Sequence, residues 1–278
     1  MTPSNAVATF RELHASGCFV LPNPWDVGSA RYLQHLGFKA LASTSAGFAF
    51  SQGLPDDIGA VPLDLMLTHL RELAAATPLP VNADFQNGFA DDPEGVASHV
   101  TRCIATGVAG LSIEDSTGRS NSPLYGEGLA IERIRAARAA IDASGIPVVL
   151  TGRCEAWLVG QQDPLPFALK RLVAYAEAGA DCLYAPSVRE PDDIAAIVRA
   201  VAPKPVNVLM SAPHPALTVA KLADLGVRRI SVGSTLARAA WGGFMRAARG
   251  IAETGTFDVL ADAAPFDEVN DMFRVRGR

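Results

Sequence analysis

"EAGADCLYA", residues 177–185, is one of four similar segments that decide which fold this sequence favours. The others are HLGFKALAS (35–43), ATGVAGLSI (105–113) and DLGVRRISV (224–232). In each segment a glycine precedes a short apolar run. Glycine readily adopts the left-handed conformation that ends a helix, and a short apolar run is typical of a buried strand. Each segment therefore predicts a helix end followed by a strand, repeated along the chain.

Four more strands are predicted between these repeats, at 18–24, 79–85, 146–153 and 204–210, the last three entered through a proline. Segments with apolar residues three to four positions apart, such as 91–107 and 166–179, predict the helices between them. Eight strand–helix units over roughly 250 residues match a (β/α)₈ TIM barrel. We expect residues 1–278 to form a single barrel domain, with 243–278 as a C-terminal helical extension.

Composition excludes several classes of partner. The chain has 278 residues, is 49% hydrophobic with a mean hydropathy of +0.19, and carries a net charge of -5. Its basic residues form no run, which argues against nucleic-acid binding. With no signal peptide or membrane span in the pattern, we expect a cytoplasmic protein that acts on small molecules. Cysteines 18, 103, 154 and 182 lack CxxC spacing and are predicted to be reduced, buried thiols.

Polar side chains stand where the predicted strands end, the edge at which barrel enzymes place their chemistry. They include Asn23, Trp25, Asp26, Thr44, Ser45, Asn82, Asp84, Glu114, Asp115, Arg153, Glu155 and Asn207. Any one carboxylate there could simply cap a helix. Asp84, Glu114 and Arg153, on three nearby strands, together favour a functional site. Carboxylates suit a hard divalent cation, and arginine binds a substrate carboxylate through two hydrogen bonds.

Five motifs give a resemblance to a known family: NPWDVGSAR (23–31), GLPD (53–56), NADFQNGF (82–89), GLSIEDSTG (110–118) and TGRCEA (151–156). In this order they resemble the isocitrate lyase/phosphoenolpyruvate mutase superfamily, up to about residue 240 of the chain. The resemblance implies a TIM barrel whose last helix is exchanged between subunits, in a homodimer or homotetramer. It also implies Mg²⁺, or Mn²⁺ in its place, with a small carboxylate substrate.

The resemblance assigns roles residue by residue. Asp84 and Glu114 would hold the metal, directly or through water. Asn82 stands at the first acidic position of the family's D-x-D motif, so it offers a neutral oxygen and a weaker metal site. Arg153 would bind the substrate carboxylate, and Asp56 would hydrogen-bond near the metal's water shell. The remaining substrate-binding candidates are Trp25, Asp26, Thr44, Ser45, Ala46 and Asn207.

The gating loop of the family corresponds to RSNSPLYG, residues 119–126. It lacks the catalytic cysteine of isocitrate-type lyases. Arg119 and Asn121 instead resemble the Lys and Asn of the mutase-type loop, with a one-residue deletion, and Tyr125 is a candidate acid. The resemblance thus implies a Mg²⁺-dependent lyase, decarboxylase or mutase that acts on a small 2-oxo or 2-hydroxy acid through an enolate and cleaves a C–C or P–C bond.

Four possibilities stay open. The chain could be a 2-methylisocitrate- or isocitrate-type lyase with an acid other than cysteine, or a non-catalytic 2-oxo acid binding protein. Residues 232–243 (VGSTLARAAWGG) could bind phosphate at a helix N-terminus, although small residues there also suit close helix packing. His214, in the segment after the seventh strand, could face the ligand.

Overall fold

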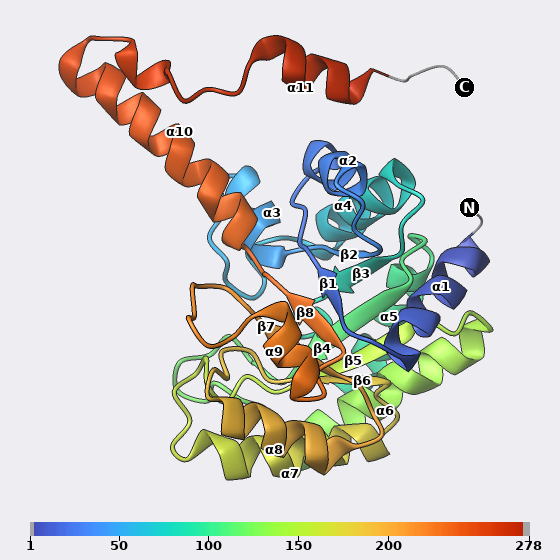
Figure 1. Cartoon of the computed structure of the whole chain (residues 1–278). Coiled ribbons are helices and arrows are strands. Elements are labelled where there is room, and N and C mark those ends of the chain that lie inside the picture. Colours follow the sequence, from blue (N-terminus) through green and yellow to red (C-terminus); the bar gives the residue numbers. More distant parts are fainter. Residues whose placement is uncertain (1–2, 275–278) are drawn as a thin grey trace.

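Eight parallel strands form one sheet in the computed structural model of the chain, which describes residues 3–274. The strands are β1 (Phe19–Leu21), β2 (Leu41–Ala42), β3 (Val81–Asp84), β4 (Gly110–Glu114), β5 (Val149–Arg153), β6 (Cys182–Tyr184), β7 (Val206–Leu209) and β8 (Arg229–Ser231). Their order is β1-β8-β7-β6-β5-β4-β3-β2. The Ala42 amide donates to the Pro22 carbonyl at 3.0 Å, across the gap between β1 and β2. The predicted (β/α)₈ barrel is therefore confirmed (Figure 1).

Helices alternate with these strands around the barrel (Figure 1). They are α1 (Pro3–Ala15), α2 (Val27–His35), α3 (Ser45–Ser51), α4 (Leu63–Ala76), α5 (Pro93–Ile104), α6 (Glu127–Ser144), α7 (Pro164–Glu177), α8 (Pro191–Val201), α9 (Val219–Asp224), α10 (Thr235–Thr254), the 3₁₀ turn η1 (Asp258–Leu260) and α11 (Phe266–Phe273). Among them, none combines the length and the apolar character needed to cross a bilayer.

The repeated glycines adopt the predicted backbone conformation. Gly37, Gly107, Gly179 and Gly226 have φ values between +84° and +105° and follow helices α2, α5, α7 and α9. Gly179 also has no room for a side chain, since a Cβ there would lie 2.5 Å from Cγ of Arg138. The four repeats therefore mark the turns that return the chain to β2, β4, β6 and β8.

The two ends of the barrel interior differ in polarity. At the amino ends of the strands, α1 closes the barrel with Phe10 and His14, which pack edge-to-face with Phe19. A Cβ on Gly110 would lie 2.7 Å from the Phe10 ring, so helix and strand are in direct contact. Further along, the buried side chains are polar: Ser112, Thr151, Asn207, Arg229 and Ser231. An apolar plug thus supports a polar interior that opens at the carboxyl ends of the strands.

The C-terminal arm, residues 235–273, extends away from the barrel (Figure 1). It consists of α10, η1 and α11, and the expected extension from residue 243 begins within α10. Large apolar side chains lie exposed along it, with Phe244 62% and Phe266 79% exposed. α11 contacts the barrel near α2, where the Phe273 ring approaches Gly28. Exchange of this arm between subunits stays a prediction.

Candidate active site

A cavity of about 270 Å³ opens at the carboxyl ends of the strands. Eight of the predicted site residues line it: Thr44, Ser45, Ala46, Asp56, Asn82, Asp84, Arg153 and Asn207. Glu114 lies next to the lining, in contact with Arg153. The fold brings these residues together because parallel strands in a barrel all end at the same rim.

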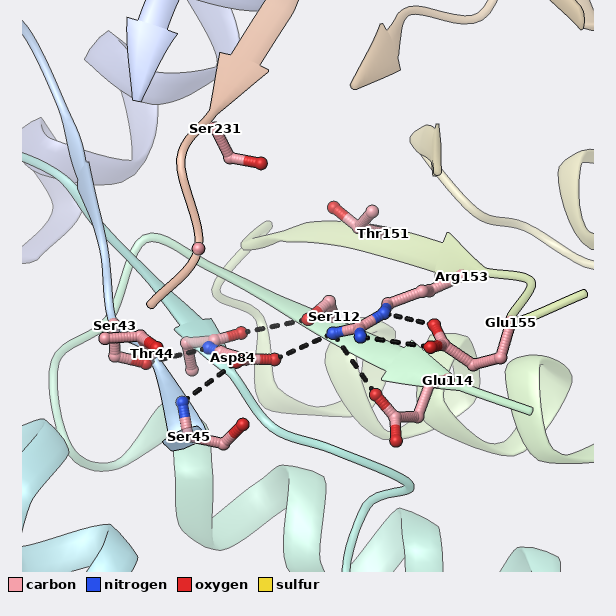
Figure 2. Close-up of polar contacts among 12 residues, drawn as sticks. Ser43, Thr44, Ser45, Asp84, Ser112, Glu114, Thr151, Arg153, Glu155 and Ser231 are labelled. Carbon is pink, nitrogen blue, oxygen red and sulfur yellow. Dashed lines mark hydrogen bonds and ion pairs between the residues drawn. The ribbon is translucent and has the colours of Figure 1, made fainter. Parts of the chain in front are cut away.

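Arg153, the last residue of β5, is the centre of the site (Figure 2). Its Nη1 atom lies 3.1 Å from Oδ1 of Asp84 and 3.2 Å from Oε2 of Glu114. Its Nε and Nη2 atoms donate to the two carboxylate oxygens of Glu155, the second at 3.2 Å. The guanidinium that was expected to bind a substrate carboxylate is thus held here by three carboxylates of the chain itself.

Negative charge exceeds positive charge around this guanidinium. Among the described residues, the four carboxyl groups of Asp56, Asp84, Glu114 and Glu155 lie near the one positive charge of Arg153. Burial raises the pKa of Glu114 well above its usual value, against the opposing pull of Arg153, and burial likewise raises the pKa of Glu155. Although Asp56 lies at the exposed rim, partial burial and the nearby Asp84 charge raise its pKa to about 6. Protonation of a carboxylate or binding of a cation would reduce this excess of negative charge.

The loop after β2 is joined to Asp84 by two hydrogen bonds. The amide of Ser45 donates to Oδ2 of Asp84 at 2.9 Å, and the amide of Asp84 donates to the Ser43 hydroxyl at 2.8 Å. Thr44 caps α3 by accepting a hydrogen bond from the Gly47 amide at 3.2 Å. A Cβ on Gly47 would clash with Thr44 at 2.6 Å, so only glycine fits at this turn. The N-terminus of α3 therefore points its first amide, that of Ser45, at the carboxylate.

The donor atoms near Asp84 are suited to a hard cation. The carboxylates of Asp84, Asp56 and Glu114 supply oxygens only, and the buried Oδ1 atom of Asn82 has no hydrogen-bond partner among the described residues. Within residues 3–274, no three His, Cys, Asp or Glu side chains converge closely enough to chelate an ion alone. A cation here would therefore complete its coordination with water or substrate oxygens, as Mg²⁺ does.

Comparison with known proteins identifies the family. The sequence model described as phosphoenolpyruvate phosphomutase matches residues 10–252. The chain belongs to the isocitrate lyase/phosphoenolpyruvate mutase superfamily.

Three relatives illustrate this membership. An uncharacterised protein of Mycobacterium tuberculosis is 34% identical over 264 residues, 94% of each chain. The structure of a putative lyase/mutase from Burkholderia cenocepacia is 47% identical with a TM-score of 0.93, covering 99% of this chain and 97% of that one. Oxaloacetate acetylhydrolase in complex with the product oxalate is 26% identical with a TM-score of 0.86, covering 98% and 95%. The prediction of an enzyme of this superfamily is confirmed.

Four residues assigned from the superfamily pattern lie outside the cavity. Asp26 caps α2 by accepting a hydrogen bond from the Ser29 amide at 2.7 Å. Trp25 packs beside Gly47 and contributes to a separate apolar pocket against α10. Arg119, in the gating loop, is exposed and pairs with Asp91 at 2.9 Å, and Asn121 is also exposed. Their positions near the rim of the barrel are set by loops, which sequence position alone does not place.

The other candidate acids and the thiols are also not among the residues that line the cavity. The Tyr125 hydroxyl donates to Asp91 and accepts a hydrogen bond from Asn87 at 3.0 Å. His214 accepts a hydrogen bond from the Ala216 amide, in the loop that follows β7. The four cysteines are free, and three of them are buried. Burial raises their thiol pKa, so they are unreactive.

The amide groups before α10 already have a partner. Oδ1 of Asn23 accepts hydrogen bonds from the amides of Val232 and Gly233, at 3.0 and 2.9 Å. A phosphate held by these two amides would have to displace the Asn23 side chain, and phosphate binding by residues 232–243 stays a prediction.

Sequence reasoning missed a buried network beneath Arg153. Asp115 accepts a hydrogen bond from the Glu155 amide at 2.8 Å, and its second oxygen accepts from Arg171 at 2.8 Å and from the Tyr175 hydroxyl at 2.7 Å. Arg171 also donates to the carbonyl of Tyr125 at 2.6 Å. This network fixes the start of the segment that carries Glu155. Its sequence signals are Asp115 and Glu155 after two predicted strands and an arginine on the apolar face of α7.

Proposed function

We propose that this chain is a Mg²⁺-dependent lyase, decarboxylase or mutase of a small 2-oxo or 2-hydroxy carboxylic acid, acting through an enolate and cleaving a C–C or P–C bond. The observation that carries this proposal is the group of four carboxylates around one guanidinium at the cavity. Buried charge is costly unless it is paired, and oxygen donors suit Mg²⁺. Membership of the superfamily supports the reaction class.

Asp84 and Glu114 would hold the metal, with Asn82 adding a neutral oxygen and Asp56 receiving hydrogen bonds from the water around it. Mn²⁺ could take the same place. When bound, the ion polarises the substrate carbonyl as a Lewis acid. Because Asn82 is uncharged, the site has one negative charge fewer than an Asp–x–Asp pair, and its affinity for the metal should be lower.

Arg153 would bind the substrate carboxylate. Its Nη1 atom now contacts Asp84 and Glu114. When those carboxylates turn to a cation, Nη1 becomes available, while the pairing with Glu155 keeps the guanidinium in place. The amides of Ser45 and Ala46, with the Thr44 hydroxyl, would stabilise negative charge that develops on the substrate oxygen. Asn207 would orient the substrate from the opposite wall.

The gating loop would complete the site by moving. When the loop closes over the cavity, Arg119 and Asn121 would become part of the site. Arg119 would then leave Asp91, its exposed partner in the present structure. Trp25 and Asp26 would form one wall beneath it. Loops of this kind exclude water while the reaction proceeds. The missing cysteine in this loop favours decarboxylation or mutase chemistry over isocitrate-type cleavage.

The C-terminal arm would pair two copies of the chain. Exposed apolar side chains of α10 border two pockets, of about 460 and 270 Å³, that also include Phe50 and Trp25 from the barrel. A partner's arm could cover these surfaces in a homodimer or in a homotetramer built from dimers. Light scattering of the purified protein would test this. A monomer at micromolar concentration would contradict it.

The cytoplasmic location and the single-domain organisation of residues 1–278 stay predictions.

An NMR time course tests the reaction class. The purified full-length protein is incubated with Mg²⁺ and a mixture of oxaloacetate, phosphonopyruvate, isocitrate, 2-methylisocitrate and 2,3-dimethylmalate. We expect one component to disappear and EDTA to stop the loss, which names the bond that breaks. Binding of oxalate with Mg²⁺ but no consumption would favour the binding-protein alternative for this panel. Loss that is insensitive to EDTA would contradict the metal assignment.

A further inference from the structure

Arg229 lies at the floor of the cavity and has no role in the function proposed above. It is the first residue of β8, its side chain points into the barrel, and it is only 2% exposed. It nevertheless lines the cavity, together with Asn207 and Ser231. A cationic side chain thus sits deep in the barrel, below Arg153.

All the hydrogen-bond partners of Arg229 are neutral. Its Nε donates to Oδ1 of Asn207 at 2.8 Å, its Nη2 to the Thr151 hydroxyl at 3.0 Å, and its Nη1 lies 3.2 Å from Nε2 of His14. Burial and the neighbouring Arg229 charge lower the pKa of His14 to about 3, so this histidine is uncharged at neutral pH. None of these groups balances the charge of the guanidinium.

The other buried arginines are held differently. Arg153 and Arg171 are each paired with carboxylates. Arg133 donates to three backbone carbonyls, stacks on the Tyr125 ring and has Asp91 nearby, and it does not line the cavity. Among residues 3–274, Arg229 is therefore the buried arginine that reaches the cavity without a carboxylate partner. An unbalanced buried charge is costly, so this position calls for an anion from outside the chain.

The walls of the cavity are also polarised. Asp84 lines the cavity from β3, and Glu114 of β4 and Glu155, two residues after β5, lie behind it against Arg153. Arg229, Asn207 and Ser231 line the other side from β7 and β8. The guanidinium has five N–H donors, and three are used by the contacts above, which leaves two. A ligand with negative groups at both ends would find a cation at each.

We propose that Arg229 binds a second anionic group of the substrate, a carboxylate or a phosphonyl group, while the reacting end lies between Asp84 and Arg153. This assignment rests on the proposed function of the same cavity. It means that the enzyme selects a 2-oxo acid carrying two anionic groups over one carrying a single carboxylate. Recognition by a fixed guanidinium is charge-assisted and directional, which gives specificity as well as affinity.

Wild-type ligand binding gives the first test. With Mg²⁺ present, calorimetric competition against oxalate compares oxaloacetate with 4-methyl-2-oxopentanoate, in which an isopropyl group of similar size replaces the second carboxylate. Phosphonopyruvate distinguishes a phosphonyl group from a carboxylate. We expect at least one dianionic ligand to bind about 10- to 100-fold more tightly than the isosteric monoacid. Equal affinities would overturn the role of Arg229 while leaving the proposed site intact. If no 2-oxo acid and no oxalate binds, the proposed function itself fails.

Substitution of Arg229 gives the second test. Arg229→Gln should remove most of the preference for the dianionic ligand and change the affinity for the monoacid by less than about threefold. Arg228→Gln is the matched control, because Arg228 is the neighbouring residue, lies outside the cavity lining and donates to the carbonyl of Gly17. This control should keep the full preference. An equal loss for both ligands in Arg229→Gln would mean that Arg229 serves only to anchor α1 through His14, and would overturn the assignment.

Arg229→Lys guards against a failure of Arg229→Gln to fold. Lysine keeps the positive charge but lacks the planar guanidinium group with its fixed N–H donors, so the preference for the dianionic ligand should fall without disappearing. Circular dichroism and thermal unfolding of each variant show whether the barrel is intact. A folded Arg229→Lys protein could instead keep both its affinity for the dianionic ligand and its preference for that ligand over the monoacid. This result would show that the guanidinium group makes no contact with the ligand, and would contradict the assignment.

Discussion

Two arginine-centred clusters on the same face of the barrel contrast in burial. Arg153 lies in the barrel interior among Asp84, Glu114 and Glu155, where burial raises the pKa of both glutamates. Arg119 lies on the gating loop with Asp91, and both side chains are at least half exposed. Water screens the exposed pair, whereas the buried cluster must balance its own charge. This contrast agrees with the proposal that the first cluster holds ligands and the second belongs to a loop that moves.

The largest effect should come from removing charge at the buried cluster. Glu114→Gln deletes a metal-binding carboxylate and a partner of Arg153, so we expect Mg²⁺-dependent oxalate binding to weaken at least about 100-fold, measured by calorimetry. Glu132→Gln makes the same change at an exposed ion pair with Arg135 and should leave binding unaltered. Wild-type affinity in Glu114→Gln would show that the metal site has been placed wrongly.

Stability should depend on the buried network below the site. Asp115→Asn breaks hydrogen bonds to Arg171 and Tyr175 and leaves a buried cation unpaired, so the free energy of unfolding should fall by about 3–5 kcal/mol. Asp64→Asn, at an exposed pair with Arg102, should cost less than about 1 kcal/mol. Urea denaturation followed by circular dichroism measures both. Similar losses for the two variants would contradict the distinction drawn between buried and exposed pairs.

The exposed cluster should affect turnover more than binding. In Arg119→Gln the gating loop loses its cation for the closed state, so we expect kcat to fall about tenfold while the Kd for Mg²⁺ stays near the wild-type value. Arg135→Gln, on the outer surface of α6, is the control. A large change in metal affinity in Arg119→Gln would indicate that the loop contributes to the metal site, and would remove the contrast between the two clusters.

The smallest expected effect is a change in pH dependence. Because the pKa of Asp56 is raised to about 6, its carboxyl is protonated below that pH and ionised above it. Loss of this negative charge weakens cation binding, so the Mg²⁺ affinity should fall as the pH drops through about 6. Asp56→Asn should flatten this part of the profile. If the Mg²⁺ affinity of Asp56→Asn still falls as the pH drops through about 6, the titrating group is not Asp56.

Much of the fold and part of the site could be predicted from local pattern. The left-handed glycines after α2, α5, α7 and α9 and the four strands that follow them occur where the repeats predict them. The other four strands occur in the segments predicted between the repeats. Asp84 and Arg153 line one cavity because the strands that carry them end at one rim. The exceptions are loop residues. Trp25, Asp26, Arg119 and Asn121 lie outside the cavity, because loop conformation depends on contacts such as Arg119 with Asp91.

By itself, the sequence determined the barrel, the rim at which polar side chains gather and the superfamily, because helix ends, strand starts and short motifs are encoded by neighbouring residues. Only the tertiary structure decided that Arg153 is held by three carboxylates and that Asp115 supports the strand-end segment from below. It also decided that Arg229, at the start of β8, reaches the cavity with neutral hydrogen-bond partners among residues 3–274. Apart from the pairing of Arg153 with the nearby Glu155, these arrangements join residues about 20 to 215 positions apart in the chain. Electrostatic balance depends on such distant contacts rather than on local pattern.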